Sequence, residues 1–475
     1  MVGSSAAHRL RLLTASPPVH AVALSLVALV VHLPTLAQPL VEAHAFRQTQ
    51  TAFAALIYHQ NGIDLLNPTV PVEGLPWQVT FEFPVFQALA AILMDLGSPA
   101  EIALRSLSLA CFVATGLLLW TVVRRIGGNG AALVALAAFL LSPFGLLWSR
   151  TSLIEFPATA CALGFVSMAL TWRERRSHAA FALAIAAGSL AMLIKPTTAV
   201  YWILPFLVLG FERDPNPLRL RRLLNPAALA LVAIPVAVGF GWTWYVDGVK
   251  AAFPGTAHLT SSAMFAWNFG TIPQRLDAAS WLTVGYRLLL MGGWLLPVAI
   301  PLAFVRARRQ RHSFFLVWMI AAASLPIATF TNLYVVHDYY LAAINPAIAG
   351  LIGLGLGGWL SQLTPRRAAA AALEGTVLWT VALLLFGSYW LPMYEPVSDP
   401  EYILPRAQQI RDRTQPGDLV AVNISAWNPA LFYYAGRWGT AIGEDLAAPP
   451  GYVAFRCTPA GDPQARCTRQ RGAMP

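Results

Sequence analysis

Long apolar segments alternate with short arginine-containing segments along most of this chain. A helix that crosses a bilayer needs about 20 largely apolar residues. Eleven segments approach or reach that length, and they lie near 19–38, 101–123, 130–148, 153–171, 179–194, 197–211, 226–246, 283–305, 314–331, 340–360 and 368–391. The pattern therefore predicts an all-α polytopic membrane protein with about 11 transmembrane helices over residues 1–391.

The first apolar segment also fits a secretory signal peptide, because Arg9 and Arg11 precede it. Such a peptide ends at a small-residue cleavage site, and the string Val31-His32-Leu33-Pro34 provides none. We therefore interpret the segment as a retained first span.

Composition and charge support the membrane assignment. The 475 residues are 57% hydrophobic and only 11% charged, whereas soluble domains carry about 25% charged residues. With the N-terminus placed in the cytoplasm, seventeen of the 32 Lys and Arg residues fall in cytoplasmic segments, against seven in outer segments before residue 392. This bias controls topology, so the net charge of +10 does not indicate nucleic-acid binding. The charges predict an integral membrane protein with the N-terminus in the cytoplasm. We expect its location to be a bacterial inner (cell) membrane.

Three segments are expected on the outer face, at about 39–100, 247–282 and 392–475. The apolar stretch 83–97 is too short to span, so we expect a juxtamembrane helix in the outer interface. Residues 392–475 suggest a small α/β soluble domain, with a helix over 402–414, a strand over 419–424 and a helix over 428–435. Cys457 and Cys467 lie on this side, where a disulfide can persist, and we expect them to be bridged.

Ionisable residues at the outer membrane boundary are the candidate chemistry. His44, Arg47, Gln48 and Thr51 have the spacing of one helix face. Three further cations lie at the same boundary, namely Arg105, Arg150 and Lys195. Such cations suit a phosphate or pyrophosphate. Carboxylates beside them, as at Glu42, Glu82 and Glu155, suit group transfer from a phosphorylated donor, because one can accept a proton while cations stabilise the leaving phosphate.

Simpler interpretations remain open for several of these residues. Arg105 could form a local ion pair with Glu101, Arg150 could pair with Glu155, and Lys195 could extend to lipid headgroups. The string His337-Asp338-Tyr339-Tyr340 fits either an interfacial aromatic belt or a substrate contact. No Walker loop, GxGxxG, HExxH or zinc-type spacing occurs, which argues against a nucleotide-driven pump.

Residues 20–360 resemble the GT-C membrane glycosyltransferases, the group that includes protein O-mannosyltransferases (glycosyltransferase family 39) and the aminoarabinose transferases of lipid A. The motifs that carry the resemblance are His44-Ala-Phe-Arg47-Gln48-Thr-Gln-Thr51, Phe81-Glu82-Phe83-Pro84, Arg105-Ser-Leu-Ser, Ser149-Arg150 with Glu155-Phe-Pro157, Lys195-Pro196 and Tyr339-Tyr340-Leu-Ala-Ala-Ile-Asn-Pro346. The first 160 residues are the most specific part.

The resemblance implies a polyprenyl-phosphate-linked sugar, hexosyl or pentosyl, as donor. Transfer would occur on the outer face with inversion, to a glycan, lipid or protein acceptor, without metal or other cofactor. Glu42 best matches the family's acidic base. Many relatives carry Asp followed directly by Glu or Asp there, whereas this chain has Glu42-Ala-His44, so His44 and Glu82 are alternative bases. Arg47, Arg105 and Lys195 would hold the phosphate. The expected acceptor or sugar contacts are Gln48, Arg150, Glu155, His337, Tyr339 and Tyr340.

A transporter or flippase for an anionic polyprenyl lipid or glycolipid is the alternative function. Transporters place ionisable residues near the bilayer midplane and are built from internal repeats. Here the middles of the predicted spans are nearly free of charge, and no repeat is evident. A non-catalytic assembly factor is a third possibility, and it would tolerate loss of Glu42 and His44.

Overall fold

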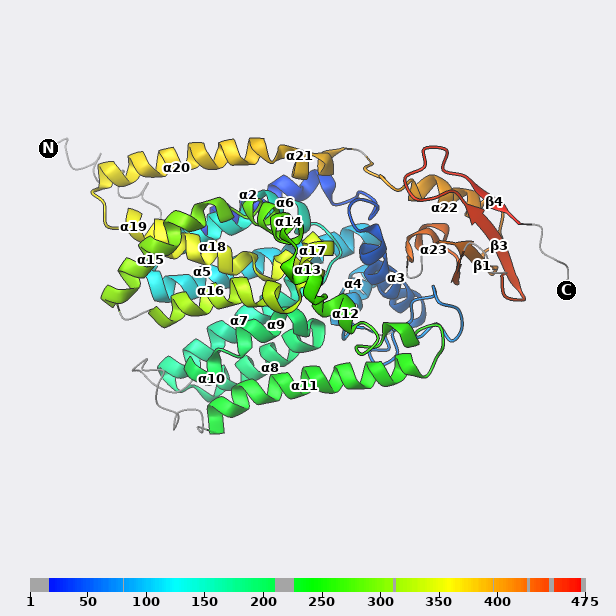
Figure 1. Ribbon diagram of the computed structural model, residues 1–475, viewed down its shortest axis with the longest axis horizontal. Coiled ribbons are helices and arrows are strands. Elements are labelled where there is room, and N and C mark those ends of the chain that lie inside the picture. Colours follow the sequence, from blue (N-terminus) through cyan, green and yellow to red (C-terminus); the bar gives the residue numbers. More distant parts are fainter. Residues whose placement is uncertain are drawn as a thin grey trace.

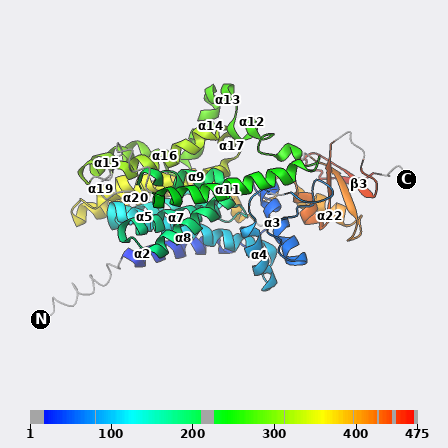
Figure 2. The same cartoon turned by 90° about the horizontal axis from the view of Figure 1, so that it is seen from below.

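The computed structural model describes residues 17–79, 81–209, 226–310, 313–395, 397–424, 428–443 and 448–470. The arginines expected in the cytoplasm at positions 9, 11, 213, 219, 221, 222 and 311 lie outside these ranges. A bundle of helices forms most of the described chain, and a small sheet with two helices lies at one end of it (Figures 1 and 2).

The N-terminal half consists of helices. Their bounds are α2 Pro17–His32, α3 Ala45–Asn61, α4 Val85–Asp95, α5 Ala100–Leu140, α6 Pro143–Trp148, α7 Glu155–Arg175, α8 His178–Ile194, α9 Pro196–Ile203, α10 Phe206–Leu209 and α11 Pro226–Ala251, with a 3-10 turn η1 at Leu33–Thr35. The short apolar stretch 83–97 is thus helical over α4, as expected.

Shorter and more irregular helices follow. They are η3 Ala257–Leu259, α12 Phe265–Phe269, α13 Ile272–Leu276, α14 Ala278–Leu289, η4 Gly293–Leu295, α15 Leu296–Gln310, α16 Ser313–Thr329, α17 Thr331–Val336, η5 Asp338–Ala343, α18 Asn345–Ile352, the π-helical η6 Gly353–Gly357, α19 Gly358–Leu360, α20 Pro365–Leu385, α21 Gly387–Trp390 and η7 Leu391–Tyr394.

Helix α5 doubles back on itself. Gly128 has φ 82° inside it, a left-handed conformation that glycine adopts without steric cost. The two arms then pack together, since a side chain at Gly116 would touch Leu136 and the rings of Phe112 and Phe139 lie 4.7 Å apart. Helix α5 therefore covers the predicted segment 101–123 and the first part of 130–148, and the short helix α6 forms the end of that second segment.

The predicted number of spans is not confirmed. Among the described residues, four helices are long and apolar enough to cross a membrane, at Pro18–Thr35 and in α5, α11 and α20. A fifth is reached if α14 and the following helix count as one span, although they are bent by 93°. Shorter apolar helices occupy several of the other predicted segments.

Two segments predicted as continuous spans were wrong in detail. The segment 197–211 is interrupted between α9 and α10, where Pro205 disfavours a helical residue before it. The segment 283–305 is interrupted after α14, where Gly292 has φ 83°. Hydropathy alone does not register these breaks, because the interrupting residues lie within apolar sequence.

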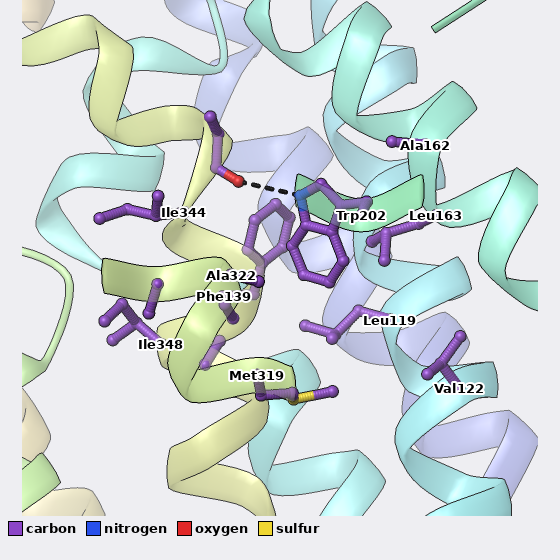
Figure 3. Close-up of a cluster of buried hydrophobic side chains, with 14 of the residues drawn as sticks. Leu119, Val122, Phe139, Ala162, Leu163, Trp202, Met319, Ala322, Ile344 and Ile348 are labelled. Atoms are coloured by element: carbon purple, nitrogen blue, oxygen red, sulfur yellow. Dashed lines mark hydrogen bonds between the residues drawn. The ribbon is translucent and has the colours of Figure 1, made fainter. Parts of the chain in front are cut away.

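The main apolar core lies between α5, α7, α9, α16 and α18 (Figure 3). Trp202 of α9 is fully enclosed there, and its indole nitrogen donates to the Ala343 carbonyl at 3.3 Å. A buried indole N–H needs such a partner. This bond fixes α9 against the segment that leads into α18.

Glycines allow η6 to approach its neighbours at backbone contact. A Cβ on Gly357 would lie 2.6 Å from the Gly130 carbonyl oxygen, and one on Gly355 would collide with the backbone of Ala299. Small residues at helix contacts permit the close packing that membrane helix bundles rely on. The sequence Gly353-Leu-Gly-Leu-Gly357 therefore joins α5 to α15.

The C-terminal part contains a four-stranded sheet of order β2-β1-β3-β4. Strand β1 pairs in parallel with β2 and β3, and β4 is antiparallel to β3. The elements are α22 Ile403–Arg411, β1 Leu419–Asn423, α23 Ala430–Ala435, β2 Gly439–Ile442, β3 Tyr452–Cys457 and β4 Cys467–Arg469. The two helices and the strand expected here are confirmed, whereas β2, β3 and β4 were not predicted.

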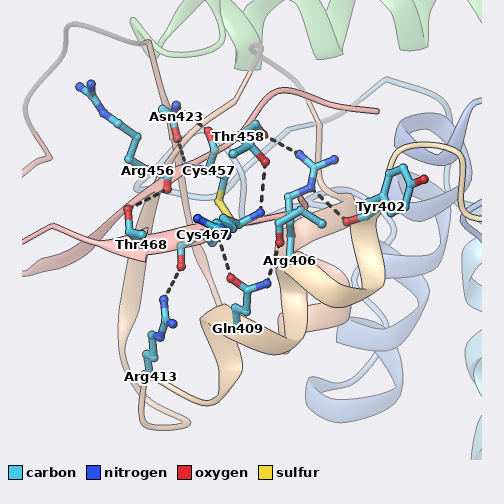
Figure 4. Close-up of a disulfide and its surroundings, with 12 residues drawn as sticks. Tyr402, Arg406, Gln409, Arg413, Asn423, Arg456, Cys457, Thr458, Cys467 and Thr468 are labelled. Carbon is cyan, nitrogen blue, oxygen red and sulfur yellow. Dashed lines mark hydrogen bonds between the residues drawn. A yellow bond between two sulfur atoms is a disulfide. The ribbon is translucent and has the colours of Figure 1, made fainter. Parts of the chain in front are cut away.

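The expected disulfide is present. Cys457 ends β3, Cys467 begins β4, and the two are paired across the antiparallel ladder (Figure 4). The Gln409 side chain of α22 accepts the Cys467 N–H at 2.8 Å and donates to the Ala465 carbonyl at 2.6 Å. The bridge therefore fastens the β3–β4 hairpin beside α22.

This α/β unit is joined to the first outer segment. The Ala441 N–H donates to the Val72 carbonyl at 2.9 Å, so residues near Val72 lie along the free edge of β2. The Tyr434 hydroxyl accepts the Leu40 N–H at 2.5 Å. One hydrophobic cluster also runs from α3 and α4 into α22, α23 and the sheet. The predicted soluble domain is therefore fixed against the predicted first outer loop.

Gly357→Ala should destabilise the protein by about 1–3 kcal/mol, the usual effect of overpacking, because the new methyl group meets the backbone of Gly130. Gly375→Ala in α20 is the matched control, since nothing lies within 4 Å of a Cβ there. It should leave stability unchanged or raise it slightly. Unfolding midpoints in detergent test this, and equal midpoints for the two variants would contradict the packing argument.

Candidate active site

Charged side chains from eight parts of the chain meet at the end of the bundle nearest the sheet. They come from the loop before α3, from α3 itself, from the segment before α4, from the N-terminal turns of α5 and α7, from the loop before α7, from the junction of α8 with α9, and from η5. These parts are far apart in sequence, and buried ion pairs hold them together.

Glu42 lies in a buried cluster with two arginines. Its Oε1 accepts from Arg105 Nη1 at 2.8 Å, its Oε2 accepts from Arg105 Nη2 at 3.0 Å, and Arg150 Nη2 lies 3.3 Å from Oε1. Bidentate pairing of this kind is strong and directional. Burial alone would raise the pKa of Glu42, but Arg105 and Arg150 outweigh it and hold the pKa below its usual value. Glu42 is therefore an ionised, fixed anchor.

All five N–H groups of Arg105 have acceptors within the protein. Besides Glu42, the guanidinium donates to the carbonyls of Gln38 at 3.1 Å, Pro39 at 2.6 Å and Arg150 at 3.1 Å. Arg105 is completely buried. The side chain expected to bind the donor phosphate instead joins the loop before α3 to the loop before α7. Arg105 pairs with Glu42, which lies 63 positions earlier in the sequence, and not with its neighbour Glu101.

Gln48 and Arg150 also make internal contacts. Gln48 donates to the Ala43 carbonyl at 3.0 Å and accepts the Ser152 N–H at 3.3 Å, while Arg150 Nη1 donates to Gln38 at 2.8 Å. Gln48 and Arg150 are both fully buried. They connect the loop 149–154 to the start of α3. The polar groups that were expected to contact the acceptor or the sugar are therefore bonded to other parts of the protein.

Arg47 retains an unused donor. Its Nη2 donates to Glu82 Oε2 at 3.1 Å, and Glu82 Oε1 accepts from Gln87 at 2.9 Å. The other terminal nitrogen, Nη1, is buried and has no partner among the described residues. Buried donors without a partner are rare in proteins, so Arg47 is a candidate contact for a ligand.

Lys195 pairs with Glu155 at the junction of α8 and α9. Its Nζ also lies 4.1 Å from the Tyr340 ring centre and 5.6 Å from that of Tyr339. Glu155 Oε2 is buried without a partner among the described residues. Lys195 is therefore enclosed by protein instead of extending to headgroups, and Glu155 pairs with it instead of with Arg150.

His44 belongs to a separate hydrogen-bond chain. Its Nε2 lies 3.0 Å from Asp338 Oδ1, and Asp338 Oδ2 accepts from the Tyr389 hydroxyl at 2.8 Å. The Trp148 indole in turn donates to the Tyr389 oxygen. Burial would raise the pKa of Asp338, but the bonds from His44 and Tyr389 lower it overall. Asp338 is therefore ionised at neutral pH.

The aromatic rings lie between these groups. Tyr339 is 4.9 Å from the His44 ring, 5.2 Å from His337 and 4.8 Å from Tyr340. Burial is the main cause that lowers the pKa of His337 to about 4, and the positive charge of Lys195 acts in the same direction. His337 is therefore neutral, and its Nδ1 has no partner among the described residues.

The site thus brings together every ionisable residue expected there, but it divides them into two sets. Glu42 and Arg105 are saturated by contacts with each other, with Arg150 and with backbone carbonyls, and Arg150 is held by Glu42 and the Gln38 side chain, although its buried Nε has no partner among the described residues. Arg47, Lys195 and His44 each keep a polar group that the described protein does not fully use. Among the described residues, no group of three or more His, Cys, Asp and Glu side chains could hold a metal ion.

Sequence reasoning left Tyr389, Gln87 and His32 out of the site, and it named Asp338 only within the string His337-Asp338-Tyr339-Tyr340, without a role of its own. His32 is fully buried, and its Nε2 contacts the Leu146 carbonyl at 3.0 Å and the Ser149 hydroxyl at 2.8 Å. A histidine within an apolar span is a recognisable signal for such a contact. No comparable pattern distinguished Tyr389 or Gln87.

The two other outer arginines have structural roles. Arg275 donates to the Ala328 and Thr329 carbonyls at the end of α16, and Arg287 donates to the Tyr334 and Val335 carbonyls at the end of α17. The last carbonyls of a helix lack intrahelical partners, and cations there are favourable. These contacts explain two of the outer positive charges without a ligand.

A family model described as dolichyl-phosphate-mannose-protein mannosyltransferase matches residues 81–242. This is about a third of the chain, and it includes Glu82, Arg105, Arg150, Glu155 and Lys195. No curated protein matches the sequence.

Solved structures share the fold over nearly the whole chain. ArnT from Cupriavidus metallidurans, bound to undecaprenyl phosphate, has a TM-score of 0.65 at 16% identity, covering 92% of each chain. The Archaeoglobus fulgidus oligosaccharyltransferase tethered to an acceptor peptide has a TM-score of 0.56 at 13% identity, covering 90% of this chain and 64% of its own. With the family model, these matches confirm the GT-C resemblance.

Arg105→Ala should destabilise the protein by about 3–5 kcal/mol, because it leaves Glu42 buried beside a single, more distant arginine. Adding Glu42→Gln should recover part of that loss, since the uncompensated charge is removed. Glu174→Ala is the control, because its pair with Arg125 is exposed and 3.9 Å long, a class worth about 0–1 kcal/mol. Denaturation in detergent measures all three, and equal losses for Arg105→Ala and Glu174→Ala would refute the anchoring role.

Proposed function

With the GT-C resemblance confirmed, we propose that this chain moves a sugar from a polyprenyl-phosphate-sugar donor to an acceptor on the outer face of the membrane, with inversion at the anomeric carbon. The observation that carries the proposal is the paired arrangement of Arg47 and Lys195. Each cation is held by one carboxylate, and each keeps further N–H groups for a ligand.

The donor phosphate can bind without breaking either ion pair. Arg47 Nη1 is free of partners among the described residues, and an ammonium carries three donors, of which Glu155 occupies one on Lys195. Besides Glu82, the Glu155 carboxylate helps to raise the pKa of Arg47, so Arg47 lies within charge–charge range of the carboxylate that pairs with Lys195. We therefore assign phosphate binding to Arg47 and Lys195. Arg105, assigned there from the resemblance, becomes a residue that fixes the site.

This arrangement suits glycosyl transfer. The leaving phosphate gains negative charge as its bond to the sugar breaks, and fixed cations stabilise that charge without reorganising. Holding donor and acceptor together adds a proximity effect. No cofactor is required in this scheme, because the lipid-linked sugar is itself a substrate. Tyr339, Tyr340 and His337 supply the aromatic surface that we assign to sugar or acceptor contact.

The location of the site supports transfer from a membrane-bound donor. Arg306 donates to the Gly127 carbonyl at the turn of α5, and α20 begins at the same end of the bundle, away from the sheet (Figure 1). The described arginines assigned to the cytoplasm therefore lie opposite the site. By the positive-inside rule, we infer that the site and the sheet face outward, from a bacterial inner membrane.

Arg47→Ala and Lys195→Ala should each lower turnover by about 10²–10³-fold, the usual effect of removing one electrostatic stabiliser of a transition state. The assay follows sugar transfer by purified protein in nanodiscs, from labelled polyprenyl-phosphate sugars to candidate lipid, glycan and peptide acceptors. Undecaprenyl phosphate, as a product of transfer, should inhibit the wild type, and it should bind both variants more weakly.

The control for this series is Arg466→Ala, an exposed arginine in the C-terminal hairpin, which should retain wild-type turnover. Unchanged turnover in both Arg47→Ala and Lys195→Ala would refute the phosphate site. If labelled lipid crosses the bilayer in proteoliposomes while no acceptor receives sugar, the flippase alternative replaces the proposal.

A further inference from the structure

His44 combines an unfavourable backbone conformation with a paired side chain. It directly precedes α3 and has φ 56° and ψ 44°, a left-handed conformation that is unfavourable for a residue other than glycine. Its imidazole does not cap the helix and instead meets Asp338. Backbone strain of this kind persists where the surrounding structure enforces it, and it often occurs at functional sites.

The partner of His44 is held from its other side. Asp338 Oδ2 accepts from Tyr389, and the Tyr389 oxygen accepts from the Trp148 indole. An ionised carboxylate can only accept hydrogen bonds, so Asp338 requires a proton on the nitrogen that faces it. That nitrogen is Nε2. The neutral imidazole then presents the lone pair of Nδ1, which has no partner among the described residues.

We propose that Nδ1 of His44 accepts the proton of the acceptor hydroxyl during sugar transfer, and that Asp338, Tyr389 and Trp148 position the imidazole for this step. The inference rests on the function proposed above. The acceptor oxygen bonds to the anomeric carbon as the bond from that carbon to the phosphate oxygen breaks. The electron pair of the broken bond stays on the phosphate beside Arg47 and Lys195. The proton moves to Nδ1, and Asp338 stabilises the imidazolium.

The carboxylates suggested by the resemblance are poorer acceptors in this structure. Both oxygens of Glu42 are bound to guanidinium groups, and the two oxygens of Glu82 are bound to Arg47 and Gln87. Hydrogen bonds to the charged form hold a carboxylate ionised and weaken it as a base. The side chains of Glu42 and Glu82 are each 7% exposed, whereas that of His44 is 22% exposed. His44 thus has both a free lone pair and access.

The surroundings of His44 contain one rival base. Besides Asp338, the titratable groups that face the ring are His337 at 5.0 Å, Tyr339 at 4.9 Å and, through electrostatic attraction, Glu401 before α22. Burial raises the pKa of Glu401, and Asp399 acts in the same direction. Trp148 and Phe46 complete the enclosure. Any test must therefore separate His44 from Glu401 as well as from Glu42.

His44→Gly followed by imidazole rescue is the decisive experiment. Glycine accepts a positive φ without strain, so the variant should fold at least as stably as the wild type. Transfer should fall by about 10²–10⁴-fold, the contribution of a general base, with a smaller change in the donor KM. Added imidazole should raise the transfer rate of His44→Gly at least tenfold, because Asp338 remains to orient the imidazole. A purely structural role gives no rescue.

The positioning roles of Asp338 and Tyr389 are tested by kcat together with imidazole rescue. Asp338→Asn should lower kcat strongly and should abolish imidazole rescue when combined with His44→Gly. Tyr389→Phe should lower kcat by about tenfold and preserve rescue.

The matched control lies on the same helix. His59 at the end of α3 pairs with Asp95 at 2.6 Å, and both side chains are exposed, away from the site. His59→Gly should keep wild-type kcat and show no response to imidazole. This comparison separates loss of a histidine–aspartate pair from loss of the proton acceptor.

The outcomes distinguish this inference from the proposed function. If the wild type transfers sugar and His44→Gly keeps a kcat near that of the wild type, His44 is not the base. The same conclusion follows if His44→Gly loses activity and imidazole restores none of it. Either result leaves the proposed transferase activity intact. Abolished transfer in well-folded Glu401→Gln or Glu42→Gln, with His44→Gly active, assigns the base to that carboxylate. Absence of transfer by the wild type to every acceptor, while it still binds undecaprenyl phosphate, overturns both proposals.

Discussion

The bidentate pair of Arg105 with Glu42 is the constraint on which the rest of the site depends. Removing two charges from water is costly, and their attraction compensates only when the geometry is good and the remaining donors are satisfied. Arg105 meets both conditions through three backbone carbonyls. Because two of these belong to the loop before α3 and one to the loop before α7, the pair fixes where α3 begins. The positions of His44 and Arg47 follow from it.

The general location of the site was predictable, but its pairings were not. Counting arginines placed the unusual cations at one boundary, and the structure brings them to one end of the bundle. Local spacing suggested Glu101 with Arg105 and Glu155 with Arg150, yet the observed pairs are Glu42 with Arg105 and Glu155 with Lys195. A partner 40 or 63 positions away is selected by helix packing, which a single sequence does not express as a periodicity.

In the fold, too, the elements set by local sequence were predictable, and the elements that depend on tertiary contacts were not. Helix α5, strand β1 and helix α22 follow from runs of apolar residues and turn signals. The interruptions at Pro205 and Gly292 lie inside apolar sequence, so length and hydropathy overlooked them. Strands β2, β3 and β4 are 3–6 residues long. Strands β2 and β3 are stabilised by pairing with β1, β4 by pairing with β3 and by the disulfide, and β2 also by the edge contact near Val72, and all of these contacts are tertiary.

Charge balance explains why only some cations remain available to a substrate. Four cations at the site, Arg47, Arg105, Arg150 and Lys195, stand against four carboxylates, Glu42, Glu82, Glu155 and Asp338, so the empty site is close to neutral. Arg105 uses all its donors on Glu42 and the two loops, and Arg150 is completely buried between Glu42 and Gln38, whereas Arg47 and Lys195 each pair with one carboxylate and keep donors beside the aromatic rings. An incoming phosphate therefore adds negative charge where unused N–H groups already lie. Because Asp338 pairs with an imidazole instead of a permanent cation, the same site can also take up a proton as that phosphate departs.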